Sequence, residues 1–164
     1  MTTALEQLRE IDLSYLSKSE AKEFALLLEE LELREKRESS ASTFYEFVLN
    51  IWPEFIAGSH HKKMAEAFDK IANGESKRLI INMPPRHTKS EFASYLFPAY
   101  LLGKRPKLKI IEATHTADLA INFGRRVRDL IDSDDYAEIF PSTQLKADSR
   151  SAGKWLTSQG GEYY

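Results

Sequence analysis

The sequence MPPRHTKS at residues 83–90 determines which fold we predict for this chain. An apolar run at residues 79–81 precedes it and predicts a strand that is buried on both faces. Apolar spacing over residues 90–102 follows it and predicts a helix, which Pro98 should bend. A loop between a buried strand and the N-terminus of a helix is where main-chain N–H groups commonly hold phosphate.

Lys89 and Ser90 match the last two residues of the phosphate-loop pattern G-x-x-x-x-G-K-[ST]. In that pattern the lysine neutralises charge on the outer phosphates, and the hydroxyl residue ligates Mg²⁺. Met83 and Thr88 stand where the pattern has its two glycines. Because Thr88 is β-branched, we expect the loop to avoid the left-handed backbone conformation there.

Helices and strands are predicted to alternate on both sides of this loop. The predicted elements are a helix over 60–72, a strand over 79–81, a helix over 90–102, a strand over 108–113 and a helix over 119–131. Ser59 should cap the first helix, and Thr114 or Thr116 the last. This order is typical of an α/β domain with a parallel sheet.

The segments 154–157 and 162–164 predict the two arms of a β-hairpin. Two parallel strands and a hairpin are few for a sheet of this class. We therefore expect the sequence to be a piece of a longer protein, or an open reading frame that is interrupted early.

Residues 1–40 differ from the rest of the chain. They hold ten acidic and six basic side chains, with neither glycine nor proline, and they predict an acidic helical segment. The spacing of Phe24, Leu27, Leu28 and Leu31 gives this segment one apolar face. Two interpretations stay open: the helix packs on its own domain, or it docks a partner. The serines at 39, 40 and 42 predict a joint between residues 1–40 and residues 41–164.

Composition excludes several classes of protein. The 164 residues include no cysteine, which excludes disulfides, thiolate catalysis and cysteine-based zinc sites. No apolar run approaches the ~20 residues that a membrane span requires. The first residues lack the layout of a signal peptide, so we expect a cytosolic protein.

Basic residues gather in the middle of the chain, with fourteen basic and six acidic side chains between residues 62 and 128. Arg125, Arg126 and Arg128 lie on the predicted helix over 119–131. They are candidates for contact with DNA or with a neighbouring subunit. The alternative is a solvated salt-bridge face with acidic residues that follow closely, namely Asp129, Asp132, Asp134 and Asp135.

From Gly58 onward the sequence resembles the large terminase subunit of tailed bacteriophages, the ATP-driven motor that packages DNA into a procapsid and cuts it. The stretches that carry the resemblance are GSHH at 58–61, KRLIINMPPRHTKSE at 77–91, FP at 97–98, ATHT at 113–116, Phe123, RRVR at 125–128, IFP at 139–141, DS at 148–149, WLT at 155–157 and GGEY at 160–163. In this family the phosphate loop often lacks its first glycine and contains Pro-Pro-Arg. The position of Thr88 is commonly Gly or Ala in the family.

The resemblance implies an α/β fold, a partial P-loop NTPase domain over residues 41–164 that follows the N-terminal helical segment. It also implies a role for each residue of the loop. Lys89 would hold the β- and γ-phosphates of ATP, and Ser90 would ligate Mg²⁺. The amides of His87, Thr88 and Lys89 would cradle phosphate oxygens, and Pro85 would belong to the same cofactor-binding loop. Arg86 would stabilise the γ-phosphate, or it is a solvated loop arginine.

His60 and His61 are unconvincing as metal ligands, because adjacent residues on a helix point about 100° apart and no acidic or cysteine partner is suitably spaced. By resemblance they would line the adenine pocket. The other interpretation is that they pack against the protein.

The implied function is ATP hydrolysis coupled to DNA translocation, in the cytoplasm of a host cell that carries the phage or prophage. The implied partners are double-stranded DNA, the small terminase subunit, the portal and procapsid, and further copies of the chain in a ring. The family's acidic strand and nuclease domain are not found in this sequence, so we expect little hydrolysis. The alternatives are a catalytically inactive prophage remnant, a partner-docking or nucleotide-binding fragment and, least favoured, a helicase-like ATPase.

Overall fold

A computed structural model describes residue 11, residues 15–151 and residues 153–164. Contacts divide the chain into two units, residues 1–39 and residues 40–164. Helix α2 (Lys18–Ser42) supplies the described structure of the first unit. The part of the predicted N-terminal helix that falls on residues 1–10 and 12–14 lies outside the described residues. None of the described helices has both the length and the apolar composition that a membrane span requires.

The boundary between the two units falls between Ser39 and Ser40, within the predicted joint, but the helix does not break at these serines. Helix α2 continues to Ser42, and the break comes at Thr43, whose hydroxyl accepts a hydrogen bond from Glu46 N–H at the start of α3 (Phe44–Ile51). Serine is only a moderately poor helix former, so three serines without glycine or proline do not end a helix. Thr43 ends it because its extended backbone and its side chain suit the N-cap position.

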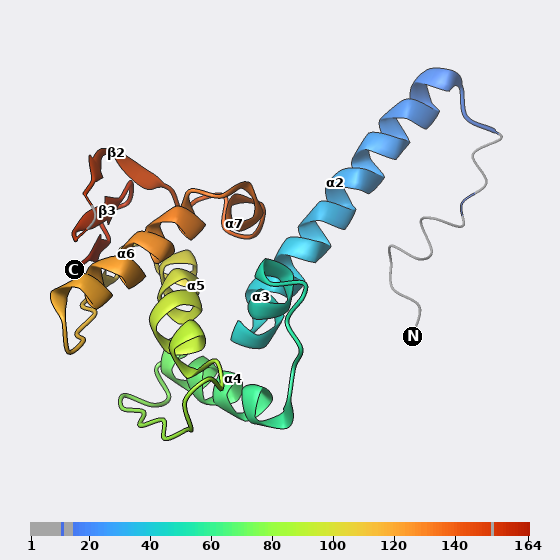
Figure 1. The fold of residues 1–164 in the computed structure, drawn as a ribbon. Coiled ribbons are helices and arrows are strands. Elements are labelled where there is room, and N and C mark those ends of the chain that lie inside the picture. The colour runs from blue at the N-terminus through green and yellow to red at the C-terminus, as the bar shows by residue number, and fades with distance from the viewer. Residues whose placement is uncertain (1–10, 12–14, 152) are drawn as a thin grey trace. The chain divides into compact units, whose positions relative to one another are not determined.

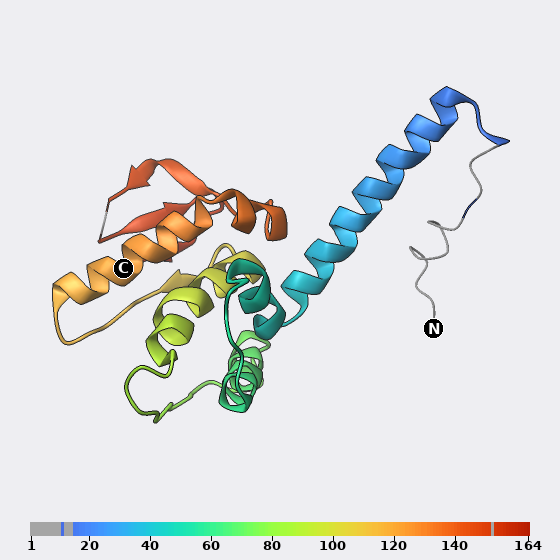
Figure 2. The same cartoon turned by 45° about the vertical axis from the view of Figure 1, so that its right-hand side comes forward.

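The second unit is a mixed α/β structure (Figure 1). Its remaining helices are α4 (Ser59–Ala72), the π-helix η2 (Glu91–Leu96), α5 (Phe97–Lys104), α6 (Ala117–Ile131) and α7 (Asp134–Ile139); its strands are β1 (Lys109–Ile110), β2 (Leu145–Arg150), β3 (Trp155–Thr157) and β4 (Glu162–Tyr163). Both views show α6 between the small sheet and α5 (Figures 1 and 2). The predicted helices over 60–72 and 119–131 are confirmed, and Thr116 caps the second.

The sheet has the strand order β1-β4-β3-β2, with β1 parallel to β4 and the other pairs antiparallel. The predicted hairpin is confirmed, with Trp155 paired to Tyr163 and Leu156 to Glu162. The predicted strand over 79–81 is wrong. These residues join no ladder in the described chain, and Ile80 is 85% exposed. An apolar run becomes a buried strand only where neighbouring strands cover it.

The helix that we predicted over residues 90–102 begins at Lys89. It continues through η2 into α5. Phe97 N–H donates to Phe92 O, five residues earlier, as in a π-helix. Pro98 comes next and has no N–H to donate. Our prediction of a helix here is confirmed, and its π-helical stretch ends two residues before Pro98, where we predicted a bend.

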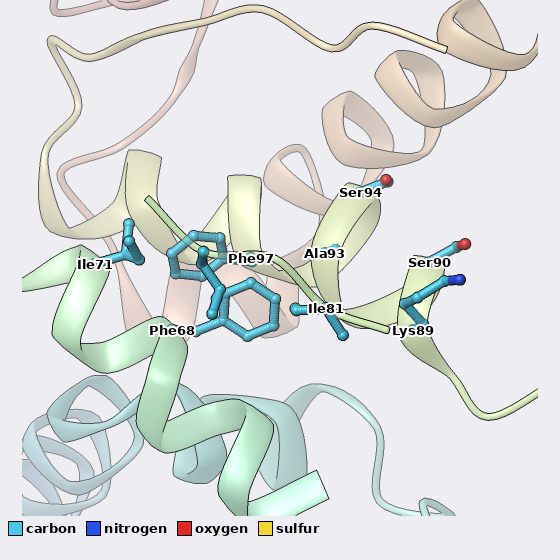
Figure 3. A pocket seen from close by; sticks show the side chains of 9 residues that line it. Phe68, Ile71, Ile81, Lys89, Ser90, Ala93, Ser94 and Phe97 are labelled. Carbon is cyan, nitrogen blue, oxygen red and sulfur yellow. The ribbon is translucent and has the colours of Figure 1, made fainter. Parts of the chain in front are cut away.

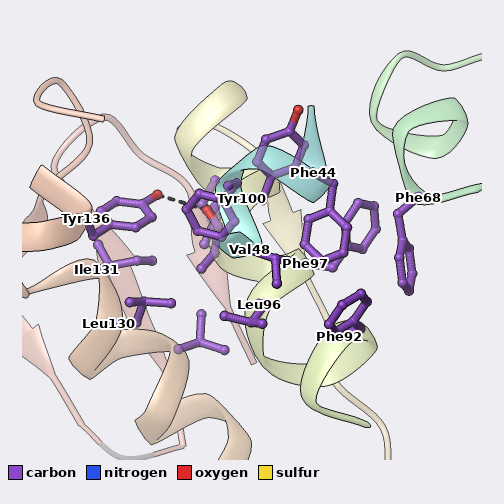
Figure 4. Packing of buried hydrophobic residues seen from close by; sticks show 14 of the residues in the cluster. Phe44, Val48, Phe68, Phe92, Leu96, Phe97, Tyr100, Leu130, Ile131 and Tyr136 are labelled. Atoms are coloured by element: carbon purple, nitrogen blue, oxygen red, sulfur yellow. Dashed lines mark hydrogen bonds between the residues drawn. The ribbon is translucent and has the colours of Figure 1, made fainter. Parts of the chain in front are cut away.

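An aromatic cluster forms the core of the second unit (Figure 4). Phe44 is its centre, and its ring contacts the rings of Phe47, Phe68, Phe92, Phe97 and Tyr100 at centroid distances of 5.2–6.4 Å. Tyr136 reaches the same cluster and donates its hydroxyl to Ala99 O at 2.9 Å. On the other side of α6, Trp155 donates to Gly124 O and stacks on Tyr163. The core therefore holds α3, α4, η2, α5 and α6 together.

Gly161 provides a test of how the hairpin docks on the segment before β1. A Cβ at this position would lie 2.3 Å from Pro106 O and 2.9 Å from Leu108 O, both main-chain atoms. We predict that Gly161→Ala lowers the free energy of unfolding by about 1–3 kcal/mol, because the backbone must move. Gly153→Ala is the matched control, since its Cβ would meet only Ile121 at 3.7 Å. Urea denaturation measures both, and equal stability of the two variants would contradict the described docking.

Candidate functional site

The loop at residues 85–88 has a strained backbone. Arg86 has φ of +63° and Thr88 has φ of +57°, which place both in the left-handed region. Our expectation that Thr88 would avoid this region is wrong. A β-branched residue adopts such a conformation only where its surroundings impose it, and strained positions of this kind cluster at functional sites.

The loop presents unpaired main-chain donors directly before the helix. Among the described residues, the N–H groups of His87, Thr88, Lys89 and Ser90 make no main-chain hydrogen bond in the loop that precedes the helix. The main-chain hydrogen bonds of the helix start one turn later, where Phe92 N–H donates to Thr88 O at 2.9 Å. Successive N–H groups around a left-handed residue form a concave anion-binding surface. The positive end of the helix dipole adds to the attraction for an anion.

Two cavities meet at Lys89 and Ser90. One, of about 410 Å³, is lined by the loop itself, residues 83–91. The other, of about 430 Å³, has an apolar floor that includes Phe68, Ile81 and Phe97. The amine of Lys89 and the hydroxyl of Ser90 point to the same side, away from the two phenylalanine rings (Figure 3). A cation and a hydroxyl therefore lie on one side of the loop, next to the amides of the same residues, and this donor set suits phosphate oxygens.

His61 connects the start of α4 to the loop. Its Nδ1 accepts a hydrogen bond from Gly58 N–H at 2.8 Å, and its Nε2 lies 2.6 Å from Thr88 Oγ1. The Thr88 hydroxyl donates to His87 O at 2.7 Å. Because Nδ1 accepts, the neutral ring carries its proton on Nε2 and donates it to Thr88. The chain of bonds therefore has one direction, from Gly58 through His61 to Thr88 and His87.

His60 and His87 lie beside this histidine. The His60 ring is 3.8 Å from the His61 ring and 6.0 Å from the His87 ring, measured between centroids. Neither of the two cavities at Lys89 is lined by His60 or His61. In the described part of the chain, no group of three His, Cys, Asp or Glu side chains is arranged to hold a metal ion.

Burial lowers the pKa of His61 below the ordinary value of 6.5, and electrostatic interaction with the neighbouring His60 and His87 lowers it further. The Gly58 N–H donates to Nδ1 and so disfavours a proton on that nitrogen, which also lowers the pKa of His61. The unfolded chain therefore takes up this proton before the folded chain does. Neutral His61 contributes stability that is present above about pH 6.5 and is lost as the pH falls through the lower folded value.

We predict that this contribution appears as a difference between the wild type and His61→Gln. The wild type should lose more unfolding free energy than the variant between pH 7.5 and pH 5, because only the wild type has this imidazole to protonate. Urea denaturation at several pH values measures the difference. Parallel pH profiles for the two proteins would show that His61 is not held in its neutral form.

The three candidate arginines on α6 differ in whether they have an acidic partner within the described chain. Arg126 makes a two-point ion pair with Glu91, with N–O distances of 3.0 and 2.5 Å, and its guanidinium lies 4.2 Å from the Tyr95 ring centroid. Arg128 pairs with Asp129 at 2.6 Å. Arg125 is exposed on the same helix. Arg126 therefore ties α6 to η2.

Sequence reasoning missed two carboxyl groups near the loop. Glu91 follows Ser90 directly, but nothing local in the sequence shows that its partner is 35 residues away. Glu112 follows β1, and burial raises its pKa while a hydrogen bond from Ser94 opposes the shift. Ser94 lines the second cavity beside Lys89 and Ser90. A search for any acidic residue within the predicted strand over 108–113, rather than for an acidic pair, would have found Glu112.

Comparison of the chain with protein-family models, with curated protein sequences and with solved structures gave no match.

Proposed function

We propose that this chain binds MgATP at residues 85–90 and is the ATP-binding part of a phage DNA-packaging motor, the terminase large subunit. The observation that supports the nucleotide site best is the left-handed turn at Thr88, which leaves consecutive N–H groups free next to Lys89. The motor assignment rests on the order of the motifs around this loop and at residues 155–163.

In this proposal the protein contributes positive charge and hydrogen-bond donors. The amides of His87, Thr88 and Lys89 hold phosphate oxygens, and the Lys89 amine neutralises the outer phosphates. The Ser90 hydroxyl is one ligand to Mg²⁺, whose other ligands come from the nucleotide and water. Arg86, exposed on the loop, places a second cation near the terminal phosphate. Bound ATP supplies the phosphoanhydride bond whose hydrolysis drives translocation in such motors.

The partners follow from the same proposal. Arg125 is the candidate for double-stranded DNA or a neighbouring subunit, because Arg126 and Arg128 have acidic partners within the chain. Helix α2 is the candidate for docking the small subunit, the portal or the procapsid. Its Leu27 and Leu31 are 53% and 41% exposed.

A second candidate function is nucleotide binding without turnover. The segment at residues 79–81 favours it, because it pairs with no described strand, and a loop entered from an unpaired segment is less rigidly placed for catalysis. Release of inorganic phosphate from MgATP by the 164-residue chain separates the two candidates. Multiple turnovers favour the motor enzyme, and binding with no phosphate release favours the second candidate.

Lys89→Ala tests the site itself. We predict that it weakens MgATP binding by about 10- to 100-fold, because it removes one charge-assisted contact with the phosphates. Lys70→Ala is the matched control, since Lys70 is an exposed lysine on α4 that takes no part in the loop. Isothermal titration calorimetry measures both variants. Equal affinity of the wild type and Lys89→Ala, or no binding by the wild type, would contradict the proposal.

A further inference from the structure

Thr88 is a β-branched residue whose backbone adopts a conformation that is typical of glycine. Its φ of +57° would suit glycine, the residue that stands at this position in the phosphate-loop pattern. With threonine, the same conformation is unfavourable unless another contact holds it. The hydroxyl of Thr88 has two such contacts, at 2.6 Å to His61 Nε2 and at 2.7 Å to His87 O.

His61 is itself held in a single orientation. Its residue is 6% exposed, and its ring packs against Phe55 and Phe92 at centroid distances of 4.7 and 5.4 Å. Gly58 N–H occupies Nδ1, so the ring cannot turn over without losing a hydrogen bond. Both ring nitrogens are therefore engaged within the protein, which leaves neither to read an adenine base.

We propose that His61 is a positioning residue for this loop: its neutral imidazole holds Thr88 in the left-handed conformation that glycine would adopt unaided. His61 and Thr88 together replace the missing glycine. This inference relies on the proposed nucleotide site for its binding readout, but the His61–Thr88 bond belongs to the protein alone.

The test removes His61 in two backgrounds. His61→Phe keeps an aromatic ring among Phe55 and Phe92 but has no donor for Thr88. In the wild-type background we expect it to weaken MgATP binding about tenfold, since the loop loses its left-handed turn. In the Thr88→Gly background we expect less than a twofold change, because glycine needs no support at this φ.

Two further variants serve as controls for the same measurement. Met64→Leu, on the buried face of α4, should have the same small effect in both backgrounds and reports general loss of packing. His61→Gln retains a donor toward Thr88 and should recover part of the lost affinity. An equal loss with His61→Phe in the two backgrounds would overturn the inference and indicate direct contact with the nucleotide. No loss in the wild-type background would overturn it as well.

Two nucleotide-free measurements separate this inference from the proposed function. Nitrogen-15 NMR of the His61 ring should show the proton on Nε2 at pH 7.5, and the opposite tautomer would overturn the inference. Urea denaturation should show that His61→Phe is more destabilising with threonine at position 88 than with Thr88→Gly. If these results hold while the wild type binds no MgATP, the proposed function fails and the positioning role stands.

Discussion

The packing of α4 against η2 is the constraint on which the loop depends. Phe44 brings these elements together, with its ring 5.2 Å from Phe68 of α4 and 5.5 Å from Phe92 of η2. Phe92 then lies against His61, so the same aromatic cluster that forms the core also supports the histidine. Thr88 precedes Phe92 by four residues and lies within hydrogen-bond distance of the same histidine. Edge-to-face contacts of this kind suit a rigid support.

The strained backbone is at Thr88, whereas the hydrogen bond that stabilises it comes from His61 on α4. An isolated threonine would leave the left-handed region, and the loop would lose the surface formed by its free N–H groups. The hydrogen bond from α4 prevents this without any glycine in the loop. The Glu91–Arg126 pair adds a second tie, from the start of η2 to α6, where Tyr95 stacks on the guanidinium. Thr88 is thus connected to α4, and Glu91 to α6.

Local sequence patterns correctly predicted the helices and the hairpin that depend only on residues close together in the sequence. Helix α4 follows from its apolar spacing, and α6 follows from its cap at Thr116. The hairpin follows from the turn residues between its arms. The remaining features depend on partners distant in sequence. The segment over 79–81 needed a neighbouring strand, and Thr88 needed a histidine 27 residues away, which made its left-handed backbone impossible to infer from β-branching alone.

The central claim is that the free amides at the start of the η2 helix bind the phosphates of MgATP. Titration of the ¹⁵N-labelled chain with MgATP, followed by amide NMR, tests it most directly. The largest changes in amide chemical shift are expected at His87, Thr88, Lys89 and Ser90. Saturable changes confined to another part of the chain, with these four amides unmoved, would contradict it.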